Sequence, residues 1–167
     1  MTPQEIRDMT VPDETYPNER YGEIFVPLLG TTVEFVVLEH DPKAPMPQVA
    51  ADRVNDFLAY GSDRLSELAG ALAQNCRGHA VDFIEGVGYE SYTLNQSEVN
   101  KVNWVHYGLN ADGTPPAGWV DPEWLSHVNL IIAQQDADTK LIAHFVLPWE
   151  EEHGADVYLG ANGLLSD

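Results

Sequence analysis

The densest group of chemically reactive side chains lies near the carboxyl end of the chain. A tryptophan, three consecutive carboxylates, an imidazole and a glycine follow one another from Trp149 to Gly154. The segments on both sides alternate apolar and polar residues, and such alternation predicts β-strands. The cluster is therefore expected to be either a charged hairpin connection or the rim of a functional site.

Neighbouring strand residues extend this cluster into a candidate metal site. In the strand that ends at Leu147, alternate apolar residues point to the core, so His144 points to the opposite face. The same alternation places Asp156 of the next strand on that face. Imidazole and carboxylate groups bind zinc or a similar divalent ion, or act as an acid–base pair. One hypothesis is therefore a metal-binding module or metal-dependent hydrolase that uses His144, Glu152, His153 and Asp156.

A structural role for the same residues is the alternative. Glu152 and His153 are adjacent, so a regular strand would point them to opposite faces. The spacing of the six histidines also matches no standard metal signature. In this alternative, His153 and Gly154 form a turn with structural hydrogen bonds, while Glu150 and Glu151 are solvated. No catalytic residue and no cofactor are then expected.

The commonest enzyme signatures do not occur in the sequence. It contains no phosphate-binding loop, dinucleotide fingerprint, nucleophile elbow, H-E-x-x-H or C-x-x-C motif. The one cysteine, Cys76, lies on the apolar face of a predicted helix, which favours an inert buried thiol over a nucleophile. A single cysteine also fits a reducing compartment. These features favour a protein that is not an enzyme.

Net charge is the strongest compositional feature. Eight basic and 27 acidic residues give a formal net charge of −19. Such a surface disfavours nucleic acids and anionic membranes, and it favours basic protein partners. The alternative is that the acidity serves solubility or salt tolerance. With no membrane-length apolar run and no signal-peptide pattern at the start, we expect a soluble, cytoplasmic, bacterial protein.

The apolar patterns predict an N-terminal arm over residues 1–20, which lies on the surface or is partly disordered, and a single α+β domain over 21–167. Two strands are followed by two helices, the second of which ends near Cys76 or continues to Gly86. A short helical turn is expected at 121–124. We predict a mainly antiparallel sheet with an αα-hairpin packed on one face, in the order ββαα-β-βββ. The predicted strands are 21–28, 31–40, 102–107, 128–134, 140–147 and 155–159, and the helices begin at 48 and 62.

Aromatic residues form the other notable set. They are either a recognition patch, since tryptophan and tyrosine are enriched at interfaces, or anchors of the core and loops. An aromatic patch or an exposed strand edge would also permit a homo-oligomer. The residues concerned are Trp104, Trp119, Trp124, Trp149, Tyr89, Tyr92 and Tyr107.

The segment from Leu147 to Gly154, followed by Gly160-Ala161-Asn162-Gly163, resembles the end of an uncharacterised bacterial domain family. Members carry W-[DE]-x-E-H-G, a strand and an N-G turn, and they open with a hairpin and a helical pair. The resemblance implies structural roles for the matching residues, with both glycines at positive φ. Some members are similar to immunity proteins, which are acidic partners of toxins. The resemblance thus implies an immunity-like protein-binding domain. Its matching positions are Trp149, Glu152, His153, Gly154, Asn162 and Gly163.

Overall fold

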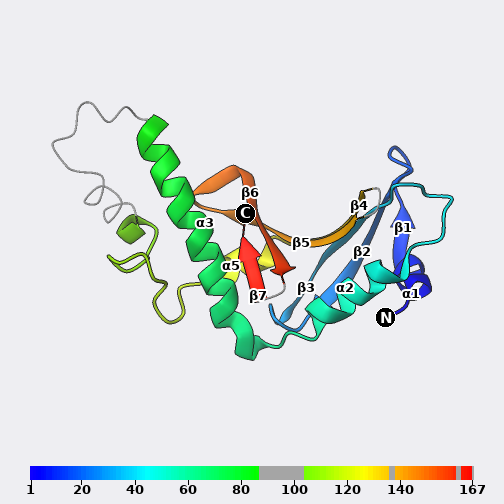
Figure 1. Ribbon diagram of the computed structural model, residues 1–167, viewed down its shortest axis with the longest axis horizontal. Helices are drawn as coiled ribbons and strands as arrows, with labels where there is room; N and C mark the ends of the chain where they lie inside the picture. The colour runs from blue at the N-terminus through cyan, green and yellow to red at the C-terminus, as the bar shows by residue number, and fades with distance from the viewer. Residues whose placement is uncertain (87–103, 136–137, 161–162, 167) are drawn as a thin grey trace.

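A computed structural model describes residues 1–86, 104–135, 138–160 and 163–166 (Figure 1). It has an α+β architecture built on one sheet, whose seven strands lie side by side in chain order from β1 to β7. Every neighbouring pair is antiparallel except β3 and β4, which are parallel. A parallel pair needs a crossover, and here the crossover contains both long helices. The expected α+β class and mainly antiparallel sheet are confirmed.

The helices and strands have the following bounds. The helices are α1 (Pro3–Met9), α2 (Gln48–Leu58), the short 3-10 helix η1 (Ser62–Arg64), α3 (Leu65–Gly86) and α5 (Pro122–Ser126). The strands are β1 (Thr10–Pro12), β2 (Glu19–Val26), β3 (Thr31–Leu38), β4 (Val128–Gln135), β5 (Asp138–Leu147), β6 (Glu150–Gly160) and β7 (Gly163–Ser166).

The hydrophobic core lies on one face of the sheet. Alternate residues of each central strand are buried there, as Phe35 of β3, Leu130 of β4 and Phe145 of β5 illustrate. In α2 the buried residues recur at helical spacing, because Ala50, Ala51, Val54 and Phe57 share one face. Each large apolar side chain buried here contributes about 1.5–3 kcal/mol relative to exposure. Burial of the helices against this face therefore holds the domain together.

The two long helices cover different parts of the sheet. Helix α2 packs against β5, whereas α3 packs against β6 and β7. Figure 1 shows them diverging from their junction at η1, so the arrangement differs from two helices lying side by side in a hairpin. Helix α3 passes through Gly78 and continues to Gly86. Among the described residues, no helix is both long and apolar enough to cross a membrane.

Residues 3–12, which were expected to belong to a surface arm, instead form α1 and β1. Thr2 and Glu5 make a reciprocal capping box, and Pro3 occupies the first turn, so α1 has a strong start signal. Ile6 is fully buried in the core. Strand β1 pairs with β2 at the edge of the sheet. The amino-terminal segment is therefore part of the folded domain.

The strand expected over residues 102–107 is also corrected in part. Residues 104–106 are helical, while 102 and 103 lie outside the described residues. Gly108 has φ +78°, and its N–H donates to the carbonyl of Val105. The N–H of Leu109 donates to the carbonyl of Trp104. This is the Schellman pattern that ends a helical turn with glycine, and it accounts for the absence of an extended conformation here.

Candidate functional site

The carboxylate and imidazole cluster lies inside β6. The connection between β5 and β6 consists of Pro148 and Trp149, since Leu147 pairs with Glu150 across the hairpin. The next register pair along β6 joins Phe145 to Ala155. Residues 151–154 thus form a large bulge in the strand opposite Val146. The expectation that the cluster forms the connecting turn is therefore replaced by a bulged strand.

His144 and Asp156 face each other across β5 and β6, as the alternation of the two strands predicts. They are register partners, and Nδ1 of His144 lies 2.8 Å from Oδ1 of Asp156. The side chains are 29% and 39% exposed. Because this pair is partly solvated, its net contribution to stability is expected to be below about 1 kcal/mol. Its geometry fixes the orientation of the imidazole ring.

Gly154 is required where the bulge approaches His144. It has φ +69°, a conformation that favours glycine. A Cβ atom at this position would lie 2.6 Å from Cε1 of His144 and 2.5 Å from the carbonyl oxygen of Phe145. Both the backbone angle and the missing side chain are therefore needed for the bulge to pack on the His144 ring.

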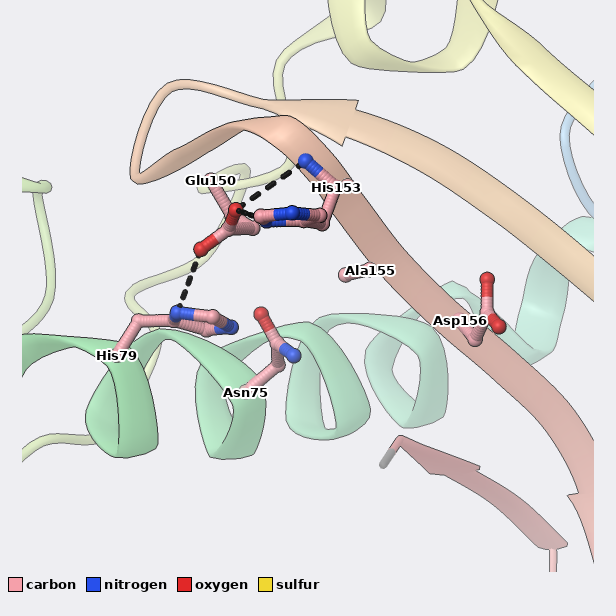
Figure 2. A pocket seen from close by; sticks show the side chains of 7 residues that line it. Asn75, His79, Glu150, His153, Ala155 and Asp156 are labelled. Carbon is pink, nitrogen blue, oxygen red and sulfur yellow. Dashed lines mark hydrogen bonds and ion pairs between the residues drawn. The ribbon is translucent and has the colours of Figure 1, made fainter. Parts of the chain in front are cut away.

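Glu150 is the centre of a three-residue cluster that joins α3 to β6 (Figure 2). Its Oε2 lies 2.8 Å from Nδ1 of His79 on α3, and its Oε1 lies 2.9 Å from Nδ1 of His153. Oε1 also accepts a hydrogen bond of 3.2 Å from the backbone N–H of His153. The Glu150 side chain is only 16% exposed, so the expectation that it is solvated is wrong.

Hydrogen bonding makes the carboxylate of Glu150 more acidic than usual. The side chain of His153 holds the pKa of Glu150 below its ordinary value, and the backbone N–H of His153 and the charge of His79 act in the same direction. A general base works best with a pKa near the working pH. Both oxygens of Glu150 are engaged and its pKa is lowered. The contacts of Glu150 with His79 and His153, here called the clasp, therefore suit a structural link between α3 and β6 better than proton transfer.

A pocket of about 400 Å³ lies between α3 and β6. Figure 2 shows Asn75 and His79 projecting from the helix toward the strand, with Glu150 and His153 on the other side. Among the described residues, strand β7 pairs with residues 157–160 of β6. The pocket therefore lies beside the earlier, bulged part of β6. Its lining residues are Asn75, His79, Glu150, His153, Gly154, Ala155 and Asp156.

The proposed metal ligands do not form one cluster. His153 contacts Glu150, while His144 contacts Asp156 and Glu152 is exposed. Within the described ranges, no group of three or more histidine, cysteine, aspartate or glutamate residues is arranged to hold a metal ion. Sequence reasoning did not identify His79 and Glu150, because their contact depends on how α3 crosses β6. His79 is one of several polar residues on α3, so the sequence gives no local signal of its partner.

Trp149 anchors the hairpin in an aromatic cluster of the core. It stacks on Trp119, with ring centroids 5.5 Å apart and planes 11° apart, and makes edge contacts with Trp124 and Tyr107. Its Nε1–H donates to Oδ1 of Asn75 over 2.9 Å. These aromatic residues thus serve as anchors. Trp104 packs partly buried against the same core, and Tyr89 and Tyr92 lie outside the described residues.

Gly163, another position that matches the motif, begins β7. Gly163 is buried, has φ +122°, and lies so close to α3 that a Cβ atom would be 3.0 Å from Oε2 of Glu67. Both motif glycines in the described residues thus have the expected positive φ. Asn162 lies outside the described residues.

Cys76 is buried in α3, and burial raises the pKa of its thiol to about 12, which makes it unreactive.

Most of the arginine side chains bind groups of the protein itself. Arg7 donates to Glu39 and to the carbonyl of Ala44, both over 2.7 Å. Arg20 donates to the carbonyls of Arg7 and Thr10. Arg64 pairs with Glu67, and Arg77 donates to the carbonyl of Gly113. Two of these contacts neutralise a carboxylate, those of Arg7 with Glu39 and of Arg64 with Glu67, but the eight basic residues are far fewer than the 27 acidic ones.

Comparisons with family models, curated proteins and solved structures gave no match to this chain. What is established is therefore the class, an α+β domain with a mostly antiparallel seven-stranded sheet. The resemblance to an immunity-like bacterial family stays a prediction.

Proposed function

We propose that this protein is a non-enzymatic, acidic binding domain that engages a basic protein, in the manner of an immunity protein. The observation that carries the proposal is the unneutralised negative charge. Acidic residues exceed basic ones by 19, and four of the five arginines bind groups of the protein itself. Uncompensated carboxylates speed the encounter with cationic partners and discriminate against anionic ones.

The geometry of the carboxyl-terminal hairpin supports a role without catalysis. Glu150 joins His79 and His153 as a clasp, and His144 is oriented by Asp156 next to Gly154. Each of these contacts fixes backbone elements to one another. Because these polar side chains hold the protein's own elements together, they are more consistent with a protein that binds a partner through its surface than with an enzyme.

Capture from host lysate, followed by salt elution, tests this proposal. We expect the immobilised protein to retain one or a few basic proteins in about 50 mM NaCl and to release them near 0.5 M, where the Debye length falls to a few ångströms. A captured protein should then be purified and its affinity measured at both salt concentrations. If no partner binds, or if binding is insensitive to salt, the proposal fails.

Co-expression gives the immunity-like role its own test. If a captured partner is toxic when produced alone, co-production of this protein should restore growth. A captured partner that is harmless to the cell would keep the binding function and remove the immunity-like one.

A metal-binding module is the second candidate, and the contact between His144 and Asp156 favours it. In this candidate, His144, Asp156, His153 and Glu152 would draw together around a divalent ion. Elemental analysis of purified protein and thermal unfolding in zinc, manganese or nickel test it, with His144→Ala as the matched variant. A metal-dependent rise in the midpoint that His144→Ala abolishes would support this candidate, and no rise would remove it.

A further inference from the structure

A row of apolar side chains crosses the whole sheet on the face opposite the core. Register partners place one such residue on each of the seven strands, each directly beside the next. With neighbouring strands about 4.8 Å apart, the row spans about 29 Å. This apolar row consists of Val11, Tyr21, Val36, Ile131, Ile142, Tyr158 and Leu165.

The apolar row is separate from the hydrophobic core. In the part of the chain that the structure describes, none of its seven residues packs into the core cluster, whereas their strand neighbours Phe35, Leu130 and Val157 do. The ends of the row are open to solvent, with Val11 67% and Leu165 39% exposed, whereas Val36 is only 7% exposed and the other four residues are half-buried. Helices α2 and α3 pack on the other face through these core residues. The row is therefore an apolar surface without a helix above it among the described elements.

Carboxylates lie along one side of the apolar row, and the other side carries both a carboxylate and a lysine. On one side, the register places Glu23 opposite Glu34, and the same line continues to His144 and Asp156. Like charges directly opposite each other destabilise a sheet, so Glu23 and Glu34 form a site where a cation would be favourable. On the other side, Tyr21 of the row donates its hydroxyl to Glu19, and the line that begins at Glu19 leads across the sheet to the exposed Lys140. The face thus combines an apolar line with a negative border along one side, at Glu23 and Glu34.

We propose that this face of the sheet binds a basic protein segment that carries apolar side chains in a line, with lysines or arginines along one side of it. The inference rests on the proposed function and names the surface that would perform it. Apolar side chains of the partner would cover Ile131, Ile142 and Tyr158. Its cations would meet Glu23 and Glu34, which relieves their mutual repulsion. The negative border is what selects a basic occupant over a second copy of this acidic chain.

Two synthetic peptides provide the probe. Both would be helical peptides of about 20 residues, long enough at 1.5 Å per residue to follow the apolar row, with the same number of lysines. One carries leucines along a single face, and the other carries serines at those positions. We expect the leucine peptide to bind the wild-type protein about tenfold more tightly than the serine peptide, because binding would bury one or two aliphatic side chains.

Variants of the face locate the binding surface. Ile142→Ser is expected to weaken binding of the leucine peptide about tenfold, and Leu165→Ser, at the exposed end, to weaken it about threefold. Val49→Ser on α2 is the matched control, because Val49 is also exposed, at 44%, but lies outside the row. Circular dichroism and thermal unfolding show whether each variant is folded. Leu165→Ser keeps the test valid if Ile142→Ser is unstable.

Charge variants test the negative border. Glu23→Gln with Glu34→Gln should weaken binding and reduce its salt dependence. Glu123→Gln with Glu152→Gln removes the same charge from exposed positions elsewhere and should have a smaller effect. Equal effects of the two pairs would mean that only the overall charge matters, and the surface inference would be overturned.

The outcomes separate this inference from the proposed function. Equal binding of both peptides, or no binding of either, overturns the surface, while capture of a salt-sensitive basic partner would still support the function. Sedimentation of the protein alone is the remaining measurement. A dimer that Ile142→Ser dissociates would also overturn the inference, because the occupant of the face would then be a second copy.

Discussion

Glu150 connects two elements that are distant in the sequence through a single carboxylate. Each of its oxygens meets a different imidazole, one from α3 and one from the bulge of β6. A carboxylate can accept several hydrogen bonds, so one side chain can orient both partners. The lowered pKa of Glu150 is the electrostatic consequence of these contacts. The contacts therefore favour the folded state while Glu150 is ionised.

Glu150→Gln should reduce stability in a pH-dependent manner. Because the folded-state pKa of Glu150 is lowered, its contribution is present above the unfolded pKa of about 4.3 and is lost as the pH falls through the folded value. Urea unfolding should show the wild type more stable than Glu150→Gln at pH 7, and the difference should shrink below about pH 4. Glu152→Gln, at an exposed position of the same strand, is the control. A difference that stays constant with pH would contradict the clasp.

Gly154→Ala tests the close approach of the bulge to His144. A left-handed backbone alone costs a non-glycine residue about 1–2 kcal/mol. Crowding against the His144 ring and the carbonyl of Phe145 adds about 1–3 kcal/mol. Gly30→Ala is the matched control, because Gly30 has nearly the same φ, +68°, and nothing within 4 Å of the added atom. Chemical unfolding should show the larger loss for Gly154→Ala, and equal losses would contradict the packing argument.

Strand alternation predicted the placement of His144 and Asp156, because side chains with a period of two leave little freedom. The same rule did not reveal Glu150, since the bulge at 151–154 interrupts the alternation. Nor could it reveal His79, whose contact requires knowing where α3 crosses the sheet. Site residues within one regular hairpin are thus predictable, whereas those that depend on a bulge or on helix placement are not.

At the scale of elements, Asn75 and Trp149 join α3 to the β5–β6 hairpin in the core. Both are buried, and the indole N–H donates to the Asn75 side chain. Asn75→Ala should cost about 1–3 kcal/mol, because it leaves this buried N–H without its acceptor. Trp149→Phe removes the N–H itself. In the Asn75→Ala background this N–H has already lost its acceptor, so Trp149→Phe should lower the free energy of unfolding by about 1 kcal/mol less than it does in the wild type.

A double-mutant cycle measured by urea unfolding would detect this coupling. Trp119→Phe is the matched control, since the indole of Trp119 donates to the carbonyl of Tyr107 instead. Its cost should be the same with and without Asn75→Ala. Additive costs for Trp149→Phe and Asn75→Ala would show that the hydrogen bond does not hold the helix to the hairpin.

Elements were predictable where local signals and periodicity agree. Helix α5 has Asp121 as its N-cap and Pro122 in its first turn, and it forms as expected. The capping box of Thr2 and Glu5 is an equally local signal for α1, but the abundance of proline and polar residues around it obscured that signal. Residues 104–106 have strand-forming residue types, yet the glycine at 108 ends a helical turn there. Tertiary packing of Trp104 overrides intrinsic preference at this point.

At the scale of the whole molecule, net charge affects stability as well as binding. The 27 acidic residues have only eight lysines and arginines to oppose them. Such an imbalance destabilises the compact state through mutual repulsion. Salt screens this repulsion, so the thermal midpoint should rise by several degrees as NaCl increases from about 20 to 150 mM, where the Debye length reaches about 8 Å.

The shape of this salt dependence identifies its cause. Screening should act mainly below about 150 mM, whereas exclusion of salt from the protein surface continues to stabilise at much higher concentrations. A variant with Glu14→Gln, Glu23→Gln and Glu34→Gln, all at exposed positions, lowers the magnitude of the charge from −19 to −16. It should unfold at a higher temperature than the wild type in low salt and gain less from added NaCl. A thermal midpoint that falls with salt would mean that attractive ion pairs outweigh the repulsion between carboxylates. The acidic surface would then not destabilise the fold, and a basic partner could not stabilise the protein by relieving such repulsion.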